Sequence, residues 1–368
     1  MLLAIFVVAV LCTACGGGQE NTLEAQKPVL TIYVYAPEHP IATRDDVGDV
    51  PATTAENRVQ SLHIWVFEHD SGSLVGYINP STATLNSQQQ DAYLMDVSDN
   101  FAKNHPNIDV YVLANPGNTL GSESSRDALD AAVMGHAEGD AFGLKTPTTS
   151  VPATGLPMSG VLRNQPVYGD YPVLRIGSEL EMATVWLQRL VSKLRFVFTR
   201  SEDSPSVVIE SITLDGGTVP AEEYLFLADD GKKYHVGSGY EPEAQLTANV
   251  DVTAACIDPQ TYIYNEYMEA TAYESLVENG IAKGELTQAG PFYLRESDRR
   301  LTGTIAYAVN GEPRQAFFQM AQAGDFARNH SWTVYGYFAS SVGAGMEVSA
   351  VYVIDWNELS ARHSVYNW

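Results

Sequence analysis

The segment Leu62–Phe67, with the sequence LHIWVF, decides the fold class of this chain. Apart from its histidine it is apolar on both faces, which is typical of a strand in the middle of a covered sheet. The turn residues Asp70-Ser71-Gly72 follow, and Leu74–Ile78 then returns the chain as a hairpin. We therefore expect a β-sheet that is covered on both sides.

Two further strands are expected on either side of this hairpin in the sequence. Upstream, Leu30–Tyr35 alternates in character, and its even positions Leu30, Ile32 and Val34 are all aliphatic. Downstream, Asp109–Asn115 is apolar enough for another internal strand. The first part of the chain is thus predicted to be a multi-stranded sheet.

The second half of the chain is again rich in predicted strands. Val207–Leu214 is expected to place Val208, Ile212 and Leu214 on one face. Further on, Asn310-Gly311 lies between two strand-like runs and is the strongest short-range signal for a β-hairpin.

The last predicted strand, Met346–Trp356, alternates along its whole length and follows a strand at Trp332–Phe338. Its apolar face is made of Met346, Val348, Ala350, Tyr352, Ile354 and Trp356. Short strands separated by turns in both halves predict an all-β protein with few short helices, built as two tandem β-sandwich domains.

Helical structure is expected at two places only. Between Ser124 and Met134 the apolar spacing suits a short helix, capped by Ser124 or Ser125. A helical turn is expected at Val185–Leu190. The domain boundary is placed near residue 183, which gives an N-terminal domain of residues 45–183 and a C-terminal domain of residues 184–368.

The charge of the chain excludes two classes of partner. Its 368 residues carry 21 Lys+Arg against 45 Asp+Glu, a net charge of −24 that repels nucleic acid and anionic membrane surfaces. The acidic residues are spread along the chain, and 45% of all residues are hydrophobic, so a globular protein with a solvated acidic surface is expected.

The first residues are interpreted as an export signal. Leu2–Ala14 is apolar but too short to span a bilayer, and small residues precede Cys15. This is similar to a bacterial lipoprotein signal over residues 1–15, in which Cys15 would be acylated; a plain secretion signal is the alternative. Met1-Leu2-Leu3 lacks the positive charge of a secretory signal, so a misplaced start codon stays open. Cys256 then remains alone, without an internal disulfide, and is expected to be buried and inert.

The sequence contains no motif of an enzyme, a metal site or a cofactor site. It has no Gly-x-Ser-x-Gly elbow, no Walker loop and no Gly-x-Gly-x-x-Gly. Its eight histidines lack metal-ligand spacing, and His63 and His69, which flank a strand and its turn, are interpreted as structural. Asp45-Asp46 and Asp49 are interpreted as a solvated loop.

Several segments in the same order along the chain resemble the fimbrillins, the subunits of the type V pili of Bacteroidota. These segments are Leu30–Arg44 leading into Val59–Phe67, Val110–Asn115, Leu190 with Lys193–Phe196, Phe292–Leu294, Arg328–His330, Val351–Trp356 and the terminal Trp368. The resemblance implies two transthyretin-like sandwich domains and a structural subunit of a cell-surface fimbria that supports adhesion.

The resemblance also implies a path of maturation. The chain would be exported as a lipoprotein and held at the outer membrane through Cys15. An Arg-specific surface protease would cut after Arg44, so that the mature chain begins at Asp45 and residues 16–44, the tether and the strand with Leu30, Ile32 and Val34, are lost. Loss of this strand would open an apolar groove in the N-terminal domain. The strand within residues 346–368 of a neighbouring subunit would fill that groove.

Alternatives remain open at this stage. Arg58 is a competing cleavage site, close to the start of a strand. The chain is alternatively a tip or accessory adhesin that binds a host protein or a glycan, for which Tyr262, Tyr264 and Tyr267 could offer a stacking face. A secreted hydrolase would require carboxylate pairs that only the fold brings together.

Overall fold

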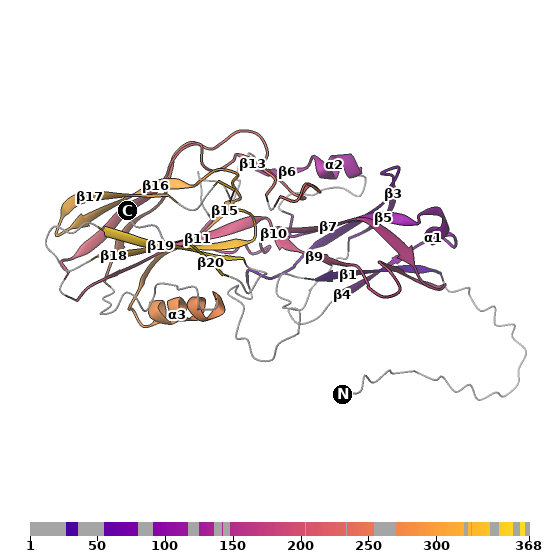
Figure 1. The fold of residues 1–368 in the computed structure, drawn as a ribbon, viewed down its shortest axis with the longest axis horizontal. Helices are drawn as coiled ribbons and strands as arrows, with labels where there is room; N and C mark the ends of the chain where they lie inside the picture. Colours follow the sequence, from indigo (N-terminus) through magenta and orange to yellow (C-terminus); the bar gives the residue numbers. More distant parts are fainter. Residues whose placement is uncertain are drawn as a thin grey trace, which may run out of the picture.

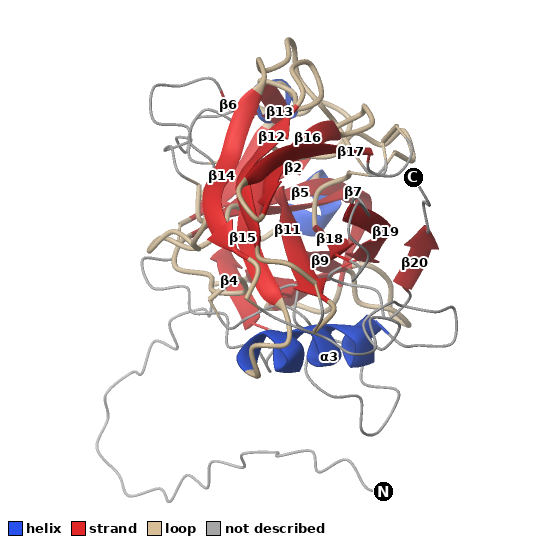
Figure 2. Cartoon of the chain, turned by 90° about the vertical axis from the view of Figure 1, so that its left-hand side faces the viewer, coloured by secondary structure: helices blue, strands red, loops and turns tan. Residues whose placement is uncertain are grey.

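The computed structural model describes residues 27–35, 55–79, 91–116, 125–135, 142, 148–202, 204–232, 234–253, 270–319, 323–324, 326–338, 346–355 and 361–364. Strands make up most of these residues and helices are few, so the all-β prediction is confirmed (Figures 1 and 2). We call residues 27–190 the N-terminal half and residues 191–364 the C-terminal half. The two halves lie end to end along the long axis (Figure 1).

The N-terminal half is built from one connected set of strands. They are β1 (Val29–Tyr35), β2 (Leu62–Glu68), β3 (Leu74–Ile78), β4 (Asp91–Asp96), β5 (Asn107–Ala114), β7 (Met158–Tyr168), β8 (Val173–Ile176), β9 (Thr184–Trp186) and β10 (Gln188–Arg189). The hydrogen-bonded order is β3-β2-β5-β7-β8-β1-β4, while β10 pairs with β7 and β9 pairs with β1. The end of β7 pairs with β8, so this strand joins the layer that holds β2 and β5 to the layer that holds β1 and β4.

The apolar core of the N-terminal half lies between these layers. Ile32 of β1 and Ile64 of β2 are fully buried in the same cluster. On the opposite face of β2, Trp65 and Phe67 are also fully buried, in a second cluster with Tyr111. The strand is therefore covered on both faces, as its sequence predicts.

The C-terminal half has two sheets. One has the order β15-β11-β18-β19-β20 and the other the order β14-β12-β16-β17. Their strands are β11 (Val191–Arg200), β12 (Val207–Leu214), β14 (Ala244–Asp251), β15 (Thr287–Arg295), β16 (Thr302–Val309), β17 (Glu312–Gln319), β18 (His330–Phe338), β19 (Met346–Asp355) and β20 (Ala361–Ser364). Their facing sides share one aromatic core, in which the Phe196 ring lies 5.4 Å from that of Phe318 in an edge-on contact.

The hairpin at Asn310-Gly311 is confirmed. It joins β16 to β17, and the φ angles of Asn310 and Gly311 are 52° and 84°. Positive φ at both central residues suits a tight turn whose twist matches that of the strands, which is why Asn-Gly is favoured there.

A small sheet connects the two halves. β6 (Val133–Gly135) belongs to the N-terminal half and β13 (Glu222–Tyr224) to the C-terminal half, and the two pair antiparallel. The predicted short helix is α2 (Arg126–Asp130), which Ser125 caps by accepting a hydrogen bond from the Ala128 N–H at 3.1 Å. α1 (Phe101–Asn104) and α3 (Ala270–Ala282) were not expected. Figure 2 shows α3 outside the strands, where Glu278 pairs with Arg195 of β11.

The helical turn expected at Val185–Leu190 is wrong. These residues form β9 and β10, and Val185 and Leu187 are buried while Trp186 is 43% exposed, which is the alternation of a strand. Pairing with β1 and β7 decides the conformation of this short segment, because periodicity is weak over so few residues. The boundary near residue 183 stays a prediction; β9 and β10 lie beyond it and pair with the N-terminal sheet.

The prediction that Val208 shares a face with Ile212 and Leu214 is also wrong. Its strand β12 changes register against β16 between Ile209 and Ser211, which is a β-bulge. The extra residue turns the side chains over, so Ile209 shares the buried face with Ile212 and Leu214, and Val208 is only half-buried.

Candidate functional site around strand β1

Strand β1 is paired on both of its edges. Along one edge it runs antiparallel to β4, from Val29 opposite Asp96 to Val34 opposite Asp91. Along the other edge it runs parallel first to β8 and then to β9, where Tyr35 lies opposite Trp186. Without β1, the sheet would therefore have two facing open edges of unpaired N–H and C=O groups.

The inward side chains of β1 are those expected from the sequence. Leu30, Ile32 and Val34 have no exposed surface, and they belong to the same apolar cluster as Val185 and Leu187. The structure thus brings the three aliphatic residues together on one buried face. Their loss would leave an apolar groove lined by β4, β8 and β9.

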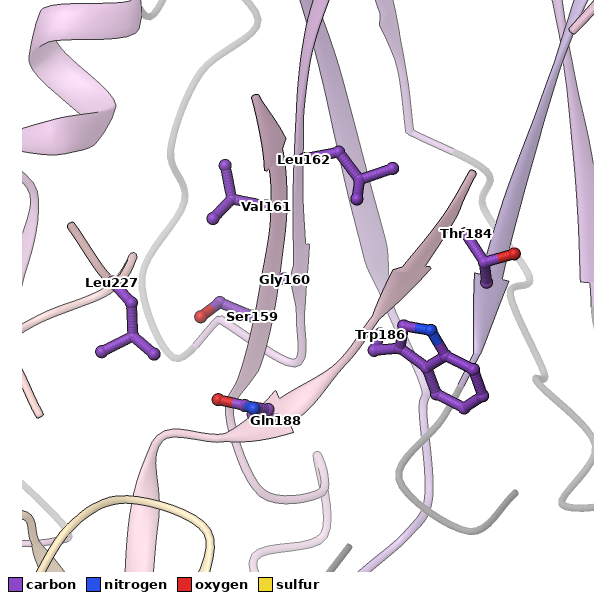
Figure 3. A pocket seen from close by; sticks show the side chains of 8 residues that line it. All are labelled: Ser159, Gly160, Val161, Leu162, Thr184, Trp186, Gln188 and Leu227. Atoms are coloured by element: carbon purple, nitrogen blue, oxygen red, sulfur yellow. The ribbon is translucent and has the colours of Figure 1, made fainter. Parts of the chain in front are cut away.

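The outward face of β1 ends beside a small pocket. Tyr35 packs against Trp186 with ring centroids 4.6 Å apart and an angle of 31° between the rings. The pocket has a volume of about 210 Å³ and is lined by Ser159, Gly160, Val161, Leu162, Thr184, Trp186, Gln188 and Leu227 (Figure 3). It lies between β7 on one side and β9 and β10 on the other.

A buried carboxylate fixes the chain shortly before β2. Glu56 is 1% exposed, forms an ion pair with the Lys193 Nζ at 3.1 Å and accepts a hydrogen bond from the Tyr293 hydroxyl at 2.6 Å. Arg189 donates to the Glu56 carbonyl at 3.2 Å. Burial and the nearby Glu56 carboxylate raise the pKa of Tyr293, so the phenol stays protonated and keeps donating. Glu56 thus joins residues 55–61, directly before β2, to the C-terminal half.

Sequence reasoning missed this cluster. The signal was present, because Lys193 stands inside the apolar run of β11, where a charge needs a buried partner. The identity of the partner depends on a contact between residues far apart in the chain. The competing cleavage residue Arg58 has an exposed side chain, while its carbonyl accepts a hydrogen bond from the Asn115 amide at 2.7 Å.

The described backbone places the predicted donor strand in the C-terminal half and not beside β1. The strand expected to be donated, β19, pairs antiparallel with β18 of its own half, and β20 pairs with its other edge. Only the backbone of β19 is described. Cys15, Arg44, Asp45, Trp356, Cys256 and the tyrosines Tyr262, Tyr264 and Tyr267 lie outside the described residues.

Two histidines near β2 have ordinary hydrogen-bond partners. The His63 Nδ1 is 2.8 Å from the Tyr77 hydroxyl, and burial lowers the pKa of His63. The His69 Nδ1 is 2.8 Å from Asp109, whose pKa burial would raise; hydrogen bonds from the Asn164 N–H and His69 outweigh that effect and lower it. Both contacts agree with a structural role.

The described part of the chain contains no group of three or more His, Cys, Asp or Glu residues placed to hold a metal ion. Within the same residues, no helix combines the length and the apolar character needed to cross a membrane.

Comparison with known proteins agrees with the predicted resemblance. Residues 29–171 match the family model of the major fimbrial subunit protein (FimA), and this match begins at the first residue of β1 and includes β7. The resemblance to the fimbrillins is thereby confirmed. No curated protein matches the chain.

Two solved structures are similar to the chain at low sequence identity. A fimbrial assembly protein from Parabacteroides distasonis is 14% identical, covers 92% of this chain and 100% of its own, and has a TM-score of 0.49. The tip fimbrial protein Mfa3 from Porphyromonas gingivalis, truncated at its C-terminus, is 12% identical, covers 93% and 100% of the two chains, and has a TM-score of 0.47.

Proposed function

We propose that this chain, whose residues 29–171 match the major fimbrial subunit family, is a structural subunit of a cell-surface fimbria that polymerises by strand exchange after proteolysis. The observation that carries the proposal is the position of β1: an N-terminal strand with both edges paired and three aliphatic side chains fully buried. Removal of such a strand creates a site for a strand from another subunit.

The energetics of β1 explain why its groove would not stay empty. Burial of three aliphatic side chains contributes about 4–9 kcal/mol, at roughly 1.5–3 kcal/mol each. A donated strand restores this burial together with the backbone hydrogen bonds of both edges. Until β1 is removed, it occupies the groove itself, so the uncut chain is protected from premature assembly.

The donated strand in this proposal is the C-terminal one. Its apolar face would be Met346, Val348, Ala350, Tyr352, Ile354 and Trp356, matching the alternation of β1. Support comes from its place in the sheet: β19 and β20 are the last two strands, and no described strand lies beyond β20. Because the donor and the groove are on different halves, the contact is head-to-tail and continues into a filament.

Cleavage after Arg44 fits the anchoring of β1 before it and of residues 55–61 after it. The cut would separate β1 from the buried Glu56, which holds the following residues against Lys193 and Tyr293. The new N-terminus at Asp45 would therefore stay attached to the folded subunit. Before the cut, an acylated Cys15 would hold the precursor at the outer membrane.

The test compares Arg44→Ala with the matched control Arg58→Ala in cells that carry an Arg-specific surface protease. Wild-type and Arg58→Ala chains should begin at Asp45 and form high-mass ladders on a gel, whereas Arg44→Ala should stay uncut and monomeric. N-terminal sequencing and intact mass provide the readout. Ladders from an uncut Arg44→Ala chain, or a mature start at Val59, would refute the proposal.

A second candidate is a tip or accessory adhesin, favoured by the 43% exposed Trp186 beside the pocket. An exposed indole with neighbouring polar side chains suits a sugar ring or a protein surface. In this case the cut chain would remain a monomer that binds a glycan or a host protein.

A further inference from the structure

Residues 219–241 form an arm that begins and ends in the C-terminal half. The two ends are joined by a hydrogen bond from the Glu241 N–H to the Val219 carbonyl at 2.9 Å. Arg295, which has no exposed surface, donates to the Pro220 carbonyl at 3.0 Å and forms an ion pair with Glu241. Val219 is part of the C-terminal apolar core. The base of the arm is therefore fixed to the C-terminal half.

The tip of the arm packs against the N-terminal half. Phe226 is buried in the cluster that includes Trp65, and its ring meets that of Tyr111 edge-on at 5.0 Å. The Leu225 N–H donates to the Ala132 carbonyl at 2.9 Å, and β13 pairs with β6. Figure 1 shows β13 and β6 side by side between the two halves.

Side chains of β7 also hold the tip. The Ser159 hydroxyl donates to the Leu225 carbonyl at 2.5 Å, and the Arg163 guanidinium donates to the Leu227 carbonyl at 2.9 Å. The tip thus has an apolar contact, a backbone ladder and side-chain hydrogen bonds to the N-terminal half.

A buried charge cluster stiffens the arm between base and tip. Glu223 and Glu296 have no exposed surface and Arg328 is 2% exposed. Arg328 pairs with Glu296 and donates to the Tyr224 carbonyl at 2.6 Å. The Glu296 N–H donates to Glu223 at 3.0 Å, and the His235 N–H donates to Glu296 at 2.7 Å. Movement of the arm would break the hydrogen bonds that Glu223, the Tyr224 carbonyl and the His235 N–H make with the buried Arg328–Glu296 pair. Loss of these bonds is unfavourable, because buried polar groups would lose partners.

We infer that this arm locks the two halves of the chain into one cooperative unit. The base and the charge cluster belong to the C-terminal half, and the tip is part of the N-terminal core, so neither half opens without disturbing the other. The inference concerns the single chain and holds whether or not the subunit polymerises.

Hydrogen exchange of the uncut chain in rising guanidinium tests this directly. Peptides from β2 and β5 report on the N-terminal half, and peptides from β11 and β18 report on the C-terminal half. In the wild type both sets of peptides should lose protection from exchange at the same guanidinium concentration, the midpoint. Phe226→Ala should separate the two midpoints by more than about 0.5 M guanidinium.

Two controls separate loss of the lock from simple loss of stability. Ile32→Ala removes core volume from the N-terminal half without touching the arm, so it should lower both midpoints together. Arg163→Ala removes the hydrogen bond to the Leu227 carbonyl of the tip together with the ion pair to Asp130, and it should separate the midpoints slightly. Asp130→Asn weakens the ion pair but leaves the Leu227 contact in place, so it should not separate them.

The inference is overturned if Phe226→Ala and Arg163→Ala shift both sets of peptides equally, as Ile32→Ala does. It is also overturned if the wild-type halves already unfold at different midpoints. If Phe226→Ala fails to fold, the Arg163→Ala and Asp130→Asn pair decides. Polymerisation plays no part in the readout, so failure of the proposed function would not affect the result.

Discussion

Strand β1 and the arm of residues 219–241 are both inserted into the N-terminal half, but they are held there by different chemistry. β1 contributes aliphatic side chains and backbone hydrogen bonds. The arm is held in addition by the buried ion pair of Arg328 and Glu296. This pair bonds to the Tyr224 carbonyl, the His235 N–H and the Glu223 carboxyl of the arm. Both segments are well packed, and only the arm depends on particular charged partners.

The difference shows which segment of such a fold is replaceable. Apolar burial has no direction, so any strand with the same alternation and similar volume recovers most of the energy of β1. A buried ion pair requires each partner at its own place, because one charge alone is strongly destabilising. An exchangeable strand is therefore expected to be apolar, and a permanent connection can be ionic.

The largest effect is expected at the buried Arg328–Glu296 pair that contacts the arm. Glu296→Ala leaves Arg328 buried without its carboxylate and should lower the free energy of unfolding by about 3–5 kcal/mol. Asp230→Ala, in an exposed pair with Lys232, should leave the free energy of unfolding nearly unchanged. Equilibrium denaturation of both variants gives the comparison. If both variants lowered the free energy of unfolding equally, the buried ion pair would be no more important for stability than the exposed pair.

A somewhat smaller effect is expected in β1. Ile32→Ala should lower the free energy of unfolding of the uncut chain by about 2–5 kcal/mol, through lost burial and a cavity. The control is Leu94→Ala on the neighbouring β4, which is 61% exposed and should change stability by no more than about 0.5 kcal/mol. Equilibrium unfolding of the two variants in urea measures both changes in the free energy of unfolding. A small effect for Ile32→Ala would show that β1 is held mainly by its backbone.

The smallest effect is expected at Glu223 of the arm, where the contribution to stability depends on pH. Complete burial, followed by the neighbouring Glu296 carboxylate, raises the pKa of Glu223 well above its usual range. In the unfolded chain the Glu223 carboxyl ionises at about pH 4.3, as a free glutamate does. The contribution of Glu223 to stability is therefore complete below this pH and is lost as the pH rises through the folded pKa.

Glu223→Gln keeps a neutral side chain at every pH. Relative to the wild type, the variant should gain stability steadily as the pH rises above about 4.3. Denaturation of both chains across a pH series provides the measurement. A constant difference between them would show that Glu223 does not change its protonation in this range.

The sequence predicted the strands whose pattern is long or whose turn is distinctive. β1 and β2 were found from alternation and from a two-sided apolar run, and the β16–β17 hairpin from Asn310-Gly311. Val185–Leu190 was misread because partners far away in the chain decide the conformation of a short segment. The bulge in β12 depends on the register with its neighbour and has no signature in the strand itself.

The all-β class, the aliphatic face of Leu30, Ile32 and Val34, and the resemblance to fimbrial subunits could be read without the fold, because each is recorded in local pattern and order along the chain. Only the tertiary structure decided that both edges of β1 are paired and that the arm joins the two halves. The physical reason is that buried pairs such as Glu56 with Tyr293 join residues far apart in sequence. Such pairs leave no periodic pattern in the sequence. A buried polar side chain needs a partner, and only the fold shows which residue that partner is.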